Sequence, residues 1–290
     1  ADGGSQIAIE LSRQIRQMGG VLFRRKEING AHVEDRHIKY LITDKDEHIY
    51  ADNFISNLHP VVTTKLIGEE HFKKIYRKRI NKIENTPACF CAHFVLKENS
   101  FDYLNYNIYH HKDNEDVWNI DVSDDEWPAS VMISTPANSK NPTKANGITA
   151  MTYIDHNHFN PWKESFNTVT TAGERGQSYE DIKKMYQDRL LKRIEMKFPG
   201  ISELVEHADS STPLTFRDYL HTPDGASYGM WKDCNQPFNA FINPKTNVRN
   251  LYLTGQNVVM HGILGVTVGS FLTCFYFLDK EKLIEEVRNA

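Results

Sequence analysis

The stretch NLYLTGQNVVMHGILGVTVGSFLTC, residues 250–274, decides how the rest of this sequence is interpreted. Its first five residues, NLYLT, predict a short buried strand that Gly255 ends. After a loop, residues 262–278 predict a helix with small residues at Gly265 and Gly269. A strand that leads through a glycine turn into a glycine-bearing helix is typical of nucleotide-binding α/β folds.

The start of this helix has a physical use. The first turn of a helix leaves backbone N–H groups unpaired and carries partial positive charge. Anionic oxygens bind there readily, and a glycine such as Gly262 lets a planar ring approach the backbone. The alternative is a close-packed helix whose glycines only allow neighbouring backbones to touch. Spacing alone leaves both interpretations open.

The N-terminal part of the sequence has a related pattern. Apolar residues at helical spacing predict a helix over residues 7–18, and Gly19 and Gly20 end it. Strands are then expected at residues 21–25, 37–43, 49–51 and 53–56.

The middle of the sequence differs. Strict alternation over residues 88–96 predicts a strand, and a long helix is expected from Ser178, where Asp181 completes a start that resembles a capping box. Further elements are expected as a helix at residues 72–83 and strands at residues 106–110, 130–134 and 148–154. An antiparallel sheet flanked by helices accounts for this pattern.

We therefore expect an α/β fold of mixed α+β character. Residues 1–60 and 225–290, which end in a helix over residues 280–289, form two parts of one Rossmann-like domain. Residues 61–224 form an antiparallel-sheet domain with flanking helices, which we interpret as the substrate-binding domain.

Composition excludes some classes of function. Of the 290 residues 25% are charged and the net charge is −4, so no nucleic-acid partner is expected. The 13 histidines lack metal-ligand spacing, and we predict no metal site. The four cysteines are interpreted as reduced thiols of a cytoplasmic protein. A basic helix face at residues 73–82 is interpreted first as solvated surface, with peripheral contact to an anionic membrane as the alternative.

Several ordered motifs resemble one family. Residues 250–274 resemble the C-terminal FAD motif of the phytoene desaturase and amine oxidase group of flavoproteins, most closely its retinol saturase branch. Residues 212–229 (TPLTFRDYLHTPDGASYG), 52–60 (DNFISNLHP) and 1–20 are similar to other segments of that branch. The resemblance covers nearly the whole chain.

The resemblance implies FAD as the cofactor and gives residues roles. Gly255, Gln256 and Asn257 would lie along the ribityl-phosphate side of the flavin, and Glu27 and Ile28 would contact adenine through their backbone. The residues that would present backbone N–H groups to the pyrimidine edge of the ring are Gly262, Ile263, Leu264, Gly265 and Val266. Asn257 departs from the family, which usually has a carboxylate there, so one ribityl hydrogen bond is expected to be weaker or reversed.

Two residues are candidates for proton transfer. Tyr228 and His261 fall beside the implied flavin position and carry groups that can give or accept a proton. The alternatives, which we favour, are an aromatic wall for Tyr228 and a loop residue bonded to backbone for His261.

The function implied is an FAD-dependent oxidoreductase, a saturase or desaturase of a carbon–carbon double bond in a retinoid, carotenoid or other apolar isoprenoid. The alternatives are a flavin-dependent polyene isomerase and a non-catalytic protein that binds apolar ligands. The chain resembles the C-terminal half to three-fifths of such a protein, so we expect it to be inactive alone. Its oligomeric state is not predicted.

The first prediction concerns cofactor binding. The family holds the FAD pyrophosphate on a G-x-G-x-x-G turn, and no such pattern occurs in these 290 residues. The purified 290 residues, mixed with FAD and desalted, should therefore retain little or no flavin absorbance. A stable stoichiometric yellow complex would refute this prediction.

Overall fold

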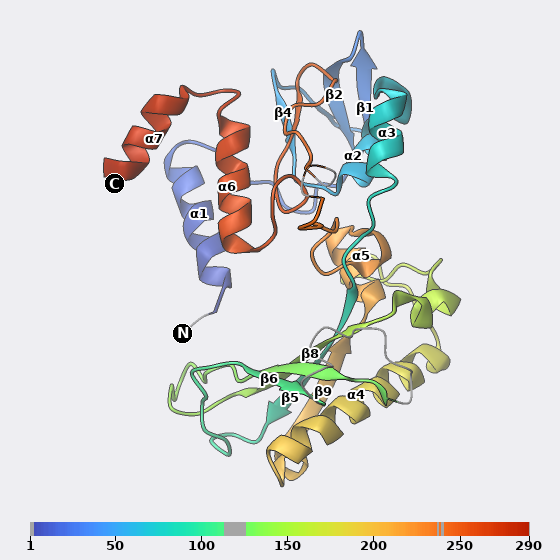
Figure 1. The fold of residues 1–290 in the computed structure, drawn as a ribbon, viewed down its shortest axis with the longest axis vertical. Helices are drawn as coiled ribbons and strands as arrows, with labels where there is room; N and C mark the ends of the chain where they lie inside the picture. Colours follow the sequence, from blue (N-terminus) through green and yellow to red (C-terminus); the bar gives the residue numbers. More distant parts are fainter. Residues whose placement is uncertain (1–2, 113–125, 237, 239–240, 290) are drawn as a thin grey trace. The chain divides into compact units, whose positions relative to one another are not determined.

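The computed structural model describes residues 3–112, 126–236, 238 and 241–289. The chain packs into two compact units (Figure 1). Unit 1 contains Ala1–Leu22 and Pro87–Leu220, and unit 2 contains Phe23–Thr86 and His221–Ala290. The expected mixture of helices with antiparallel sheet is confirmed. In the structure residues 61–86 group with unit 2. The assignment of one unit to substrate and the other to cofactor stays a prediction.

Unit 1 is built on a five-stranded antiparallel sheet with strand order β6-β7-β8-β5-β9. Its elements are α1 (Ser5–Gln17), β5 (Ala88–Leu96), β6 (Ile108–His111), β7 (Ser130–Ser134), β8 (Gly147–Ile154), α4 (Gln177–Lys197), β9 (Val205–Ser211) and α5 (Pro213–Leu220). The alternation expected over residues 88–96 corresponds to the central strand β5, and α1 matches the helix expected near the N-terminus.

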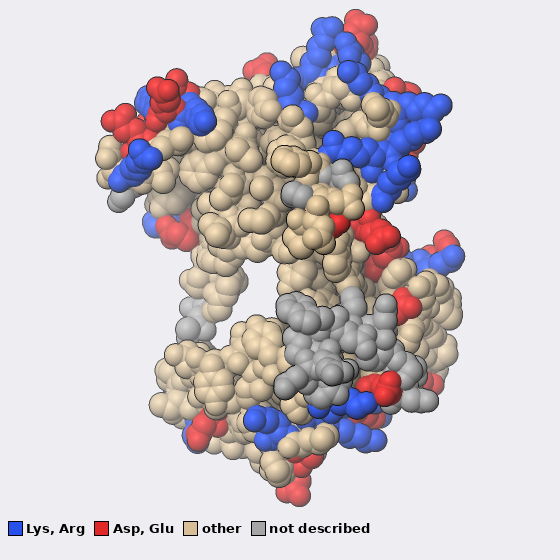
Figure 2. Space-filling view, in the orientation of Figure 1, with Lys and Arg blue, Asp and Glu red and all other residues tan. Residues whose placement is uncertain are grey.

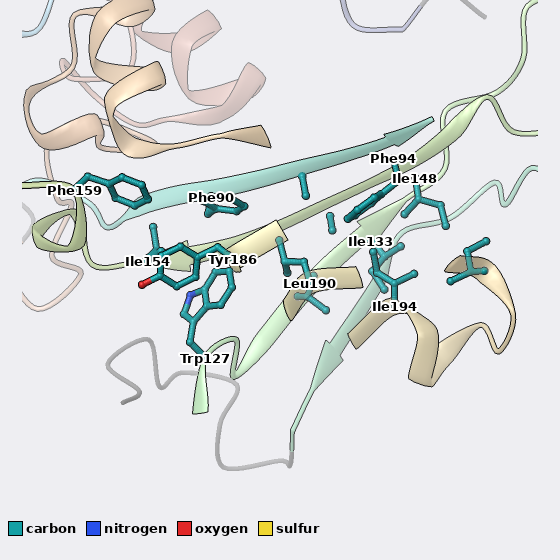
Figure 3. Packing of buried hydrophobic residues seen from close by; sticks show 14 of the residues in the cluster. Phe90, Phe94, Trp127, Ile133, Ile148, Ile154, Phe159, Tyr186, Leu190 and Ile194 are labelled. Carbon is teal, nitrogen blue, oxygen red and sulfur yellow. The ribbon is translucent and has the colours of Figure 1, made fainter. Parts of the chain in front are cut away.

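One face of this sheet is covered by α4 (Figure 3). Phe90 and Phe94 of β5 are buried beneath Tyr186 and Leu190 of α4. On the other face Val95 keeps 47% of its surface exposed. The apolar stripe of α4 therefore determines which face of the sheet becomes the core, because burying aromatic and aliphatic side chains is the main favourable term in folding.

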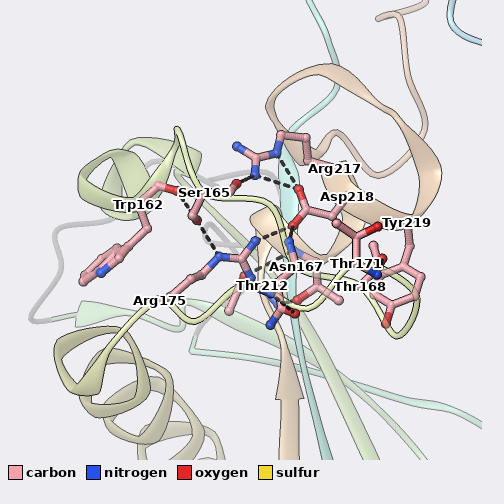
Figure 4. Close-up of polar contacts among 12 residues, drawn as sticks. Trp162, Ser165, Asn167, Thr168, Thr171, Arg175, Thr212, Arg217, Asp218 and Tyr219 are labelled. Carbon is pink, nitrogen blue, oxygen red and sulfur yellow. Dashed lines mark hydrogen bonds and ion pairs between the residues drawn. The ribbon is translucent and has the colours of Figure 1, made fainter. Parts of the chain in front are cut away.

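A buried charge cluster ties α5 to the loop that precedes α4 (Figure 4). The Asp218 carboxylate is completely buried and forms ion pairs with Arg175 and Arg217. The backbone N–H of Asn167 donates a hydrogen bond of 2.8 Å to the same carboxylate, and Arg175 Nε donates one of 2.7 Å to Ser165 Oγ. The loop is held in place by one carboxylate that satisfies several donors.

The second prediction tests this cluster. Asp218→Asn should lower the local free energy of unfolding of unit 1 by about 3–5 kcal/mol, because it leaves the buried guanidinium of Arg175 and the partly buried one of Arg217 without their counter-charge. Asp188→Asn is the matched control, since Asp188 pairs with Lys184 on the exposed surface of α4. That change should cost about 1 kcal/mol or less. Hydrogen exchange of peptides from β5 and β9 measures both effects, and equal losses would contradict the prediction.

Unit 2 contains two small sheets. One is antiparallel, with strand order β1-β2-β3, and the other is the parallel pair β10-β4. The elements are β1 (Ile28–Glu34), β2 (His37–Thr43), β3 (His48–Ile49), β4 (Phe54–Ser56), α2 (Pro60–Ile67), α3 (Lys74–Ile80), β10 (Leu251–Leu253), α6 (Gly262–Cys274) and α7 (Lys280–Asn289). Its apolar contacts centre on buried Ile38, Phe54 and Leu251 and on Met230 and Val258.

Two local predictions are wrong. Residues 21–25 form no strand, because Arg25 has a φ of +54° and Val21 and Phe23 are each 69% exposed. Asp181 does not cap α4: the helix begins after Gly176 without a side-chain cap, and Asp181 instead accepts a hydrogen bond of 2.9 Å from Gln177.

Within the described residues, no helix combines the length and the apolar composition needed to cross a bilayer.

Candidate functional site

The candidate site is built around the turn that follows β10. Thr254 N donates a hydrogen bond of 2.9 Å to Ser56 O at the end of β4, which continues the parallel pairing. Gly255 then adopts a φ of +90°. A Cβ at this position would lie 1.8 Å from Asn57 Oδ1, well inside van der Waals contact. Both backbone conformation and space therefore require glycine at residue 255.

Asn257 attaches this turn to the loop that carries Tyr228. Its side chain is 4% exposed, and its Oδ1 accepts a hydrogen bond of 2.9 Å from Met230 N. Its backbone carbonyl accepts one of 2.7 Å from Lys232 Nζ. Burial lowers the pKa of Lys232 to about 8. Asn257 is predicted to lie beside the ribityl chain, and its side-chain Oδ1 already accepts a hydrogen bond from the Met230 backbone.

The start of α6 is open. His261 precedes the helix, and its side chain does not cap it. Gly262 has a φ of +79°, and among the described residues nothing beyond its chain neighbours and its own helix backbone lies within 4 Å of where its Cβ would be. Ile263 and Leu264 are 71% and 74% exposed. In the described part of the chain, the first turn of α6 therefore has no side-chain cap and lies next to exposed residues.

The later glycines of α6 serve packing. A Cβ on Gly265 would lie 2.5 Å from Met260 O, and Gly269 is buried close to the Gly255 carbonyl. On the same face Thr273 Oγ1 donates a hydrogen bond of 2.9 Å to Leu253 O in β10. The glycines therefore differ: Gly262 leaves space, Gly265 lets the chain pass close to the Met260 carbonyl, and a Cβ on Gly269 would make ordinary contact with the Gly255 turn.

The structure brings the two candidate proton-transfer residues together. The rings of Tyr228 and His261 stack, with their centroids 5.0 Å apart and their planes inclined by 28°. Tyr228 N donates a hydrogen bond of 2.9 Å to Thr86 Oγ1, which fixes its loop. His261 is exposed, and its ring forms no hydrogen bond in the part of the chain that the structure describes. The expected bond from His261 to backbone is therefore not found among these residues.

Glu27 and Ile28 lie at a different place in unit 2. They line a pocket of about 500 Å³ beside β4 and α2, together with Phe54, Ile55 and Leu251. The Glu27 carbonyl accepts a hydrogen bond of 2.9 Å from Asp44 N. Residues 262–266 of α6 do not line this pocket.

A chain of hydrogen bonds that starts at buried His59 supports the Tyr228 loop, and the sequence patterns did not reveal it. His59 Nδ1 accepts a hydrogen bond from Val61 N, so its Nε2–H donates to Asn85 Oδ1 at 3.0 Å. Asn85 Nδ2 in turn lies 3.4 Å from Asp224 Oδ2, shortly before Tyr228. Burial lowers the pKa of His59 below its ordinary value of 6.5. The sequence signal was the His-Pro pair, in which His59 caps a helix that begins at Pro60.

These features define a strand–glycine turn–helix site within a mixed α/β fold. The fold is shared with a solved oxidoreductase from Methanosarcina mazei, which superimposes with a TM-score of 0.52 at 14% identity over 89% of this chain and 51% of that one. No family model matches the chain.

In sequence, the expected resemblance to the retinol saturase branch is confirmed. The chain is 24% identical to all-trans-retinol 13,14-reductase of Rattus norvegicus over an alignment of 310 residues that covers 99% of this chain and 50% of the relative. It is also 31% identical over 180 residues to the inactive all-trans-retinol 13,14-reductase of Danio rerio, covering 56% of this chain and 29% of that relative. The chain therefore spans about half the length of the rat relative.

The third prediction concerns pH. Because the pKa of His59 is lower in the folded chain than in the unfolded chain, its contribution to stability is fully present above pH 6.5. Below that pH the unfolded chain takes up a proton more readily, so this stability is lost as the pH falls through the folded pKa. Hydrogen exchange of α2 and β4 peptides should show weaker protection at pH 5.5 than at pH 7.5.

The matched variants separate His59 from other groups. His59→Gln should weaken protection at pH 7.5 and should flatten its decline toward pH 5.5. His48→Gln, at an exposed position of the same unit, should retain the wild-type decline. An unchanged slope in His59→Gln would show that other groups cause the pH dependence.

Proposed function

We propose that this chain supplies the C-terminal part of an FAD-dependent oxidoreductase that saturates or desaturates a carbon–carbon double bond of a retinoid, carotenoid or other isoprenoid. The observation that carries the proposal is the uncovered first turn of α6 directly after the Gly255 turn. The name of the rat relative supports the substrate class and the direction of reduction.

The residues present fit a flavin. Gly262 has open space where a side chain would otherwise stand, and the amides that follow it lack a side-chain cap. Residues 262–266 would hold the pyrimidine edge of the ring and stabilise negative charge there. Gly255, Gln256 and Asn257 would flank the ribityl side, while Glu27 and Ile28 would offer backbone atoms to adenine. When bound, FAD supplies the site that accepts or gives hydride.

Tyr228 and His261 are the chain's own groups for proton movement. An imidazole can donate a proton from one ring nitrogen and accept one at the other. Stacking on the Tyr228 ring restrains the His261 ring without occupying its nitrogen atoms. We propose that His261 exchanges a proton with the substrate and that Tyr228 positions it. The alternative role for the pair is an apolar wall against the polyene.

Product mass tests the proposed reaction. Under this proposal, a protein that joins this chain to a G-x-G-x-x-G domain of such an enzyme, purified with FAD and supplied with a reductant, should convert a retinoid or carotenoid to a product heavier by two hydrogens. A product of unchanged mass would indicate an isomerase. Binding of the polyene without conversion would indicate the non-catalytic function, the outcome suggested by the name of the Danio rerio relative.

The fourth prediction tests the helix start itself. In that protein Gly262→Asp should reduce flavin retention at least tenfold, since it places a carboxylate where the reduced ring would carry negative charge. Gly176→Asp is the matched control, because Gly176 also lies at a helix start, as the N-cap of α4, has a φ of +75° and has open space at its Cβ. The control corrects for backbone strain, and flavin lost equally from both variants would count against the site.

A further inference from the structure

The helix α3 carries an unbalanced positive charge. Residues 73–82 include six Lys and Arg residues and no Asp or Glu, in a chain whose net charge is −4. These cations are Lys73, Lys74, Arg77, Lys78, Arg79 and Lys82. Figure 2 shows Lys and Arg side chains gathered over the region that α3 occupies in Figure 1. Such a local excess of one sign attracts an oppositely charged partner.

Most of these charges are not used inside the protein. Arg77 lies 3.5 Å from Glu69, and Arg79 donates to the carbonyl of Phe241. Within residues 3–112, 126–236, 238 and 241–289, no carboxylate pairs with the remaining lysines of the segment, which are Lys73, Lys74, Lys78 and Lys82. All four are exposed. Their charge is therefore available to a ligand.

Apolar side chains accompany the cations. Ile75 is 78% exposed and Trp231 is 46% exposed, and both line a hollow of about 790 Å³ together with Lys78 and Lys82. The opposite side of α3 is anchored in the core of unit 2 by Ile80, which is 1% exposed. The cations and Ile75 of the α3 segment thus lie beside an exposed tryptophan, in a hollow that Glu84 and Asp233 also line.

We propose that this surface, formed by α3 and Trp231, docks on a membrane rich in anionic phospholipid. Lysines near an anionic bilayer gain electrostatic attraction, and tryptophan prefers the boundary between headgroups and acyl chains. The exposed Ile75 favours a bilayer over a nucleic acid, because bases stack on aromatic side chains whereas an aliphatic side chain gains from contact with acyl chains. This inference is independent of the flavin site, because the surface binds lipid whether or not the protein is catalytic.

Vesicle flotation tests the proposal on the chain as it stands. The protein should float with phosphatidylcholine vesicles that contain about 30% phosphatidylserine and should remain behind with pure phosphatidylcholine. High salt should weaken the binding. Equal flotation with both vesicles would overturn the proposal, as would a preference for single-stranded RNA with no vesicle binding.

Variants locate the surface. Lys78→Gln with Lys82→Gln should reduce the partition coefficient about 30-fold, the factor expected for two lysines of about 1 kcal/mol each. Trp231→Ala should weaken binding also at high salt, because its contribution is apolar. Lys184→Gln with Lys192→Gln is the charge-matched control on the exposed side of α4. Circular dichroism checks that each variant is folded. Identical losses in the two double variants would show only a net-charge effect and would overturn the assignment to α3.

Discussion

The close approach of Gly255 to Asn57 is the constraint on which the candidate site depends. The parallel pairing of β10 with β4 places the end of one strand beside the first residue after the other. No side chain fits at residue 255, because the Asn57 amide already occupies that space. A residue that must be glycine in a left-handed conformation lets the chain leave β10 sharply. The direction of that turn determines where α6 begins.

Packing of α6 then depends on the same turn. Gly269 lies close to the Gly255 carbonyl. Thr273 donates its hydrogen bond to the carbonyl of Leu253, the last residue of β10. These contacts fix the helix against β10 at its buried face. Among the described residues, Gly262 at the other end of the helix has open space where a Cβ would stand.

The sequence predicted much of this local structure and less of its tertiary arrangement. Alternation identified β5, which lies buried in the sheet, and helical spacing identified α1 and α7. Neither of these two helices buries a residue in the structure, so their spacing predicted the helix but not the burial of its apolar side. The strand predicted at residues 21–25 is wrong, because β-forming composition needs a neighbouring strand and no described strand pairs with these residues. The spacing of the glycines in α6 could not separate packing from ligand access, since that difference depends on which atoms surround each Cβ.

Contacts between distant parts of the sequence were beyond such patterns. Stacking of Tyr228 on His261 requires the 228–232 loop to be held against the β10–α6 turn, and the hydrogen bond from Met230 to Asn257 does this. The ion pair between Arg175 and Asp218 is of the same kind, because 43 residues separate the two and only the tertiary fold brings them together. The motifs selected Tyr228 and His261 as candidates one by one, and only the tertiary structure shows that their rings meet.

The departure at Asn257 can be understood from these contacts. A carboxylate at this position, as the resemblance leads one to expect, would accept the Met230 amide just as the Asn257 amide oxygen does. The hydrogen bond that joins the two loops is thus retained, and only the negative charge is lost. Asn257 is 4% exposed, so a negative charge at this position would need a nearby positive charge. Lys232 binds the carbonyl of Asn257, but burial lowers its pKa and thereby disfavours its charged form. The neutral side chain therefore preserves the architecture of the site while changing its electrostatic character.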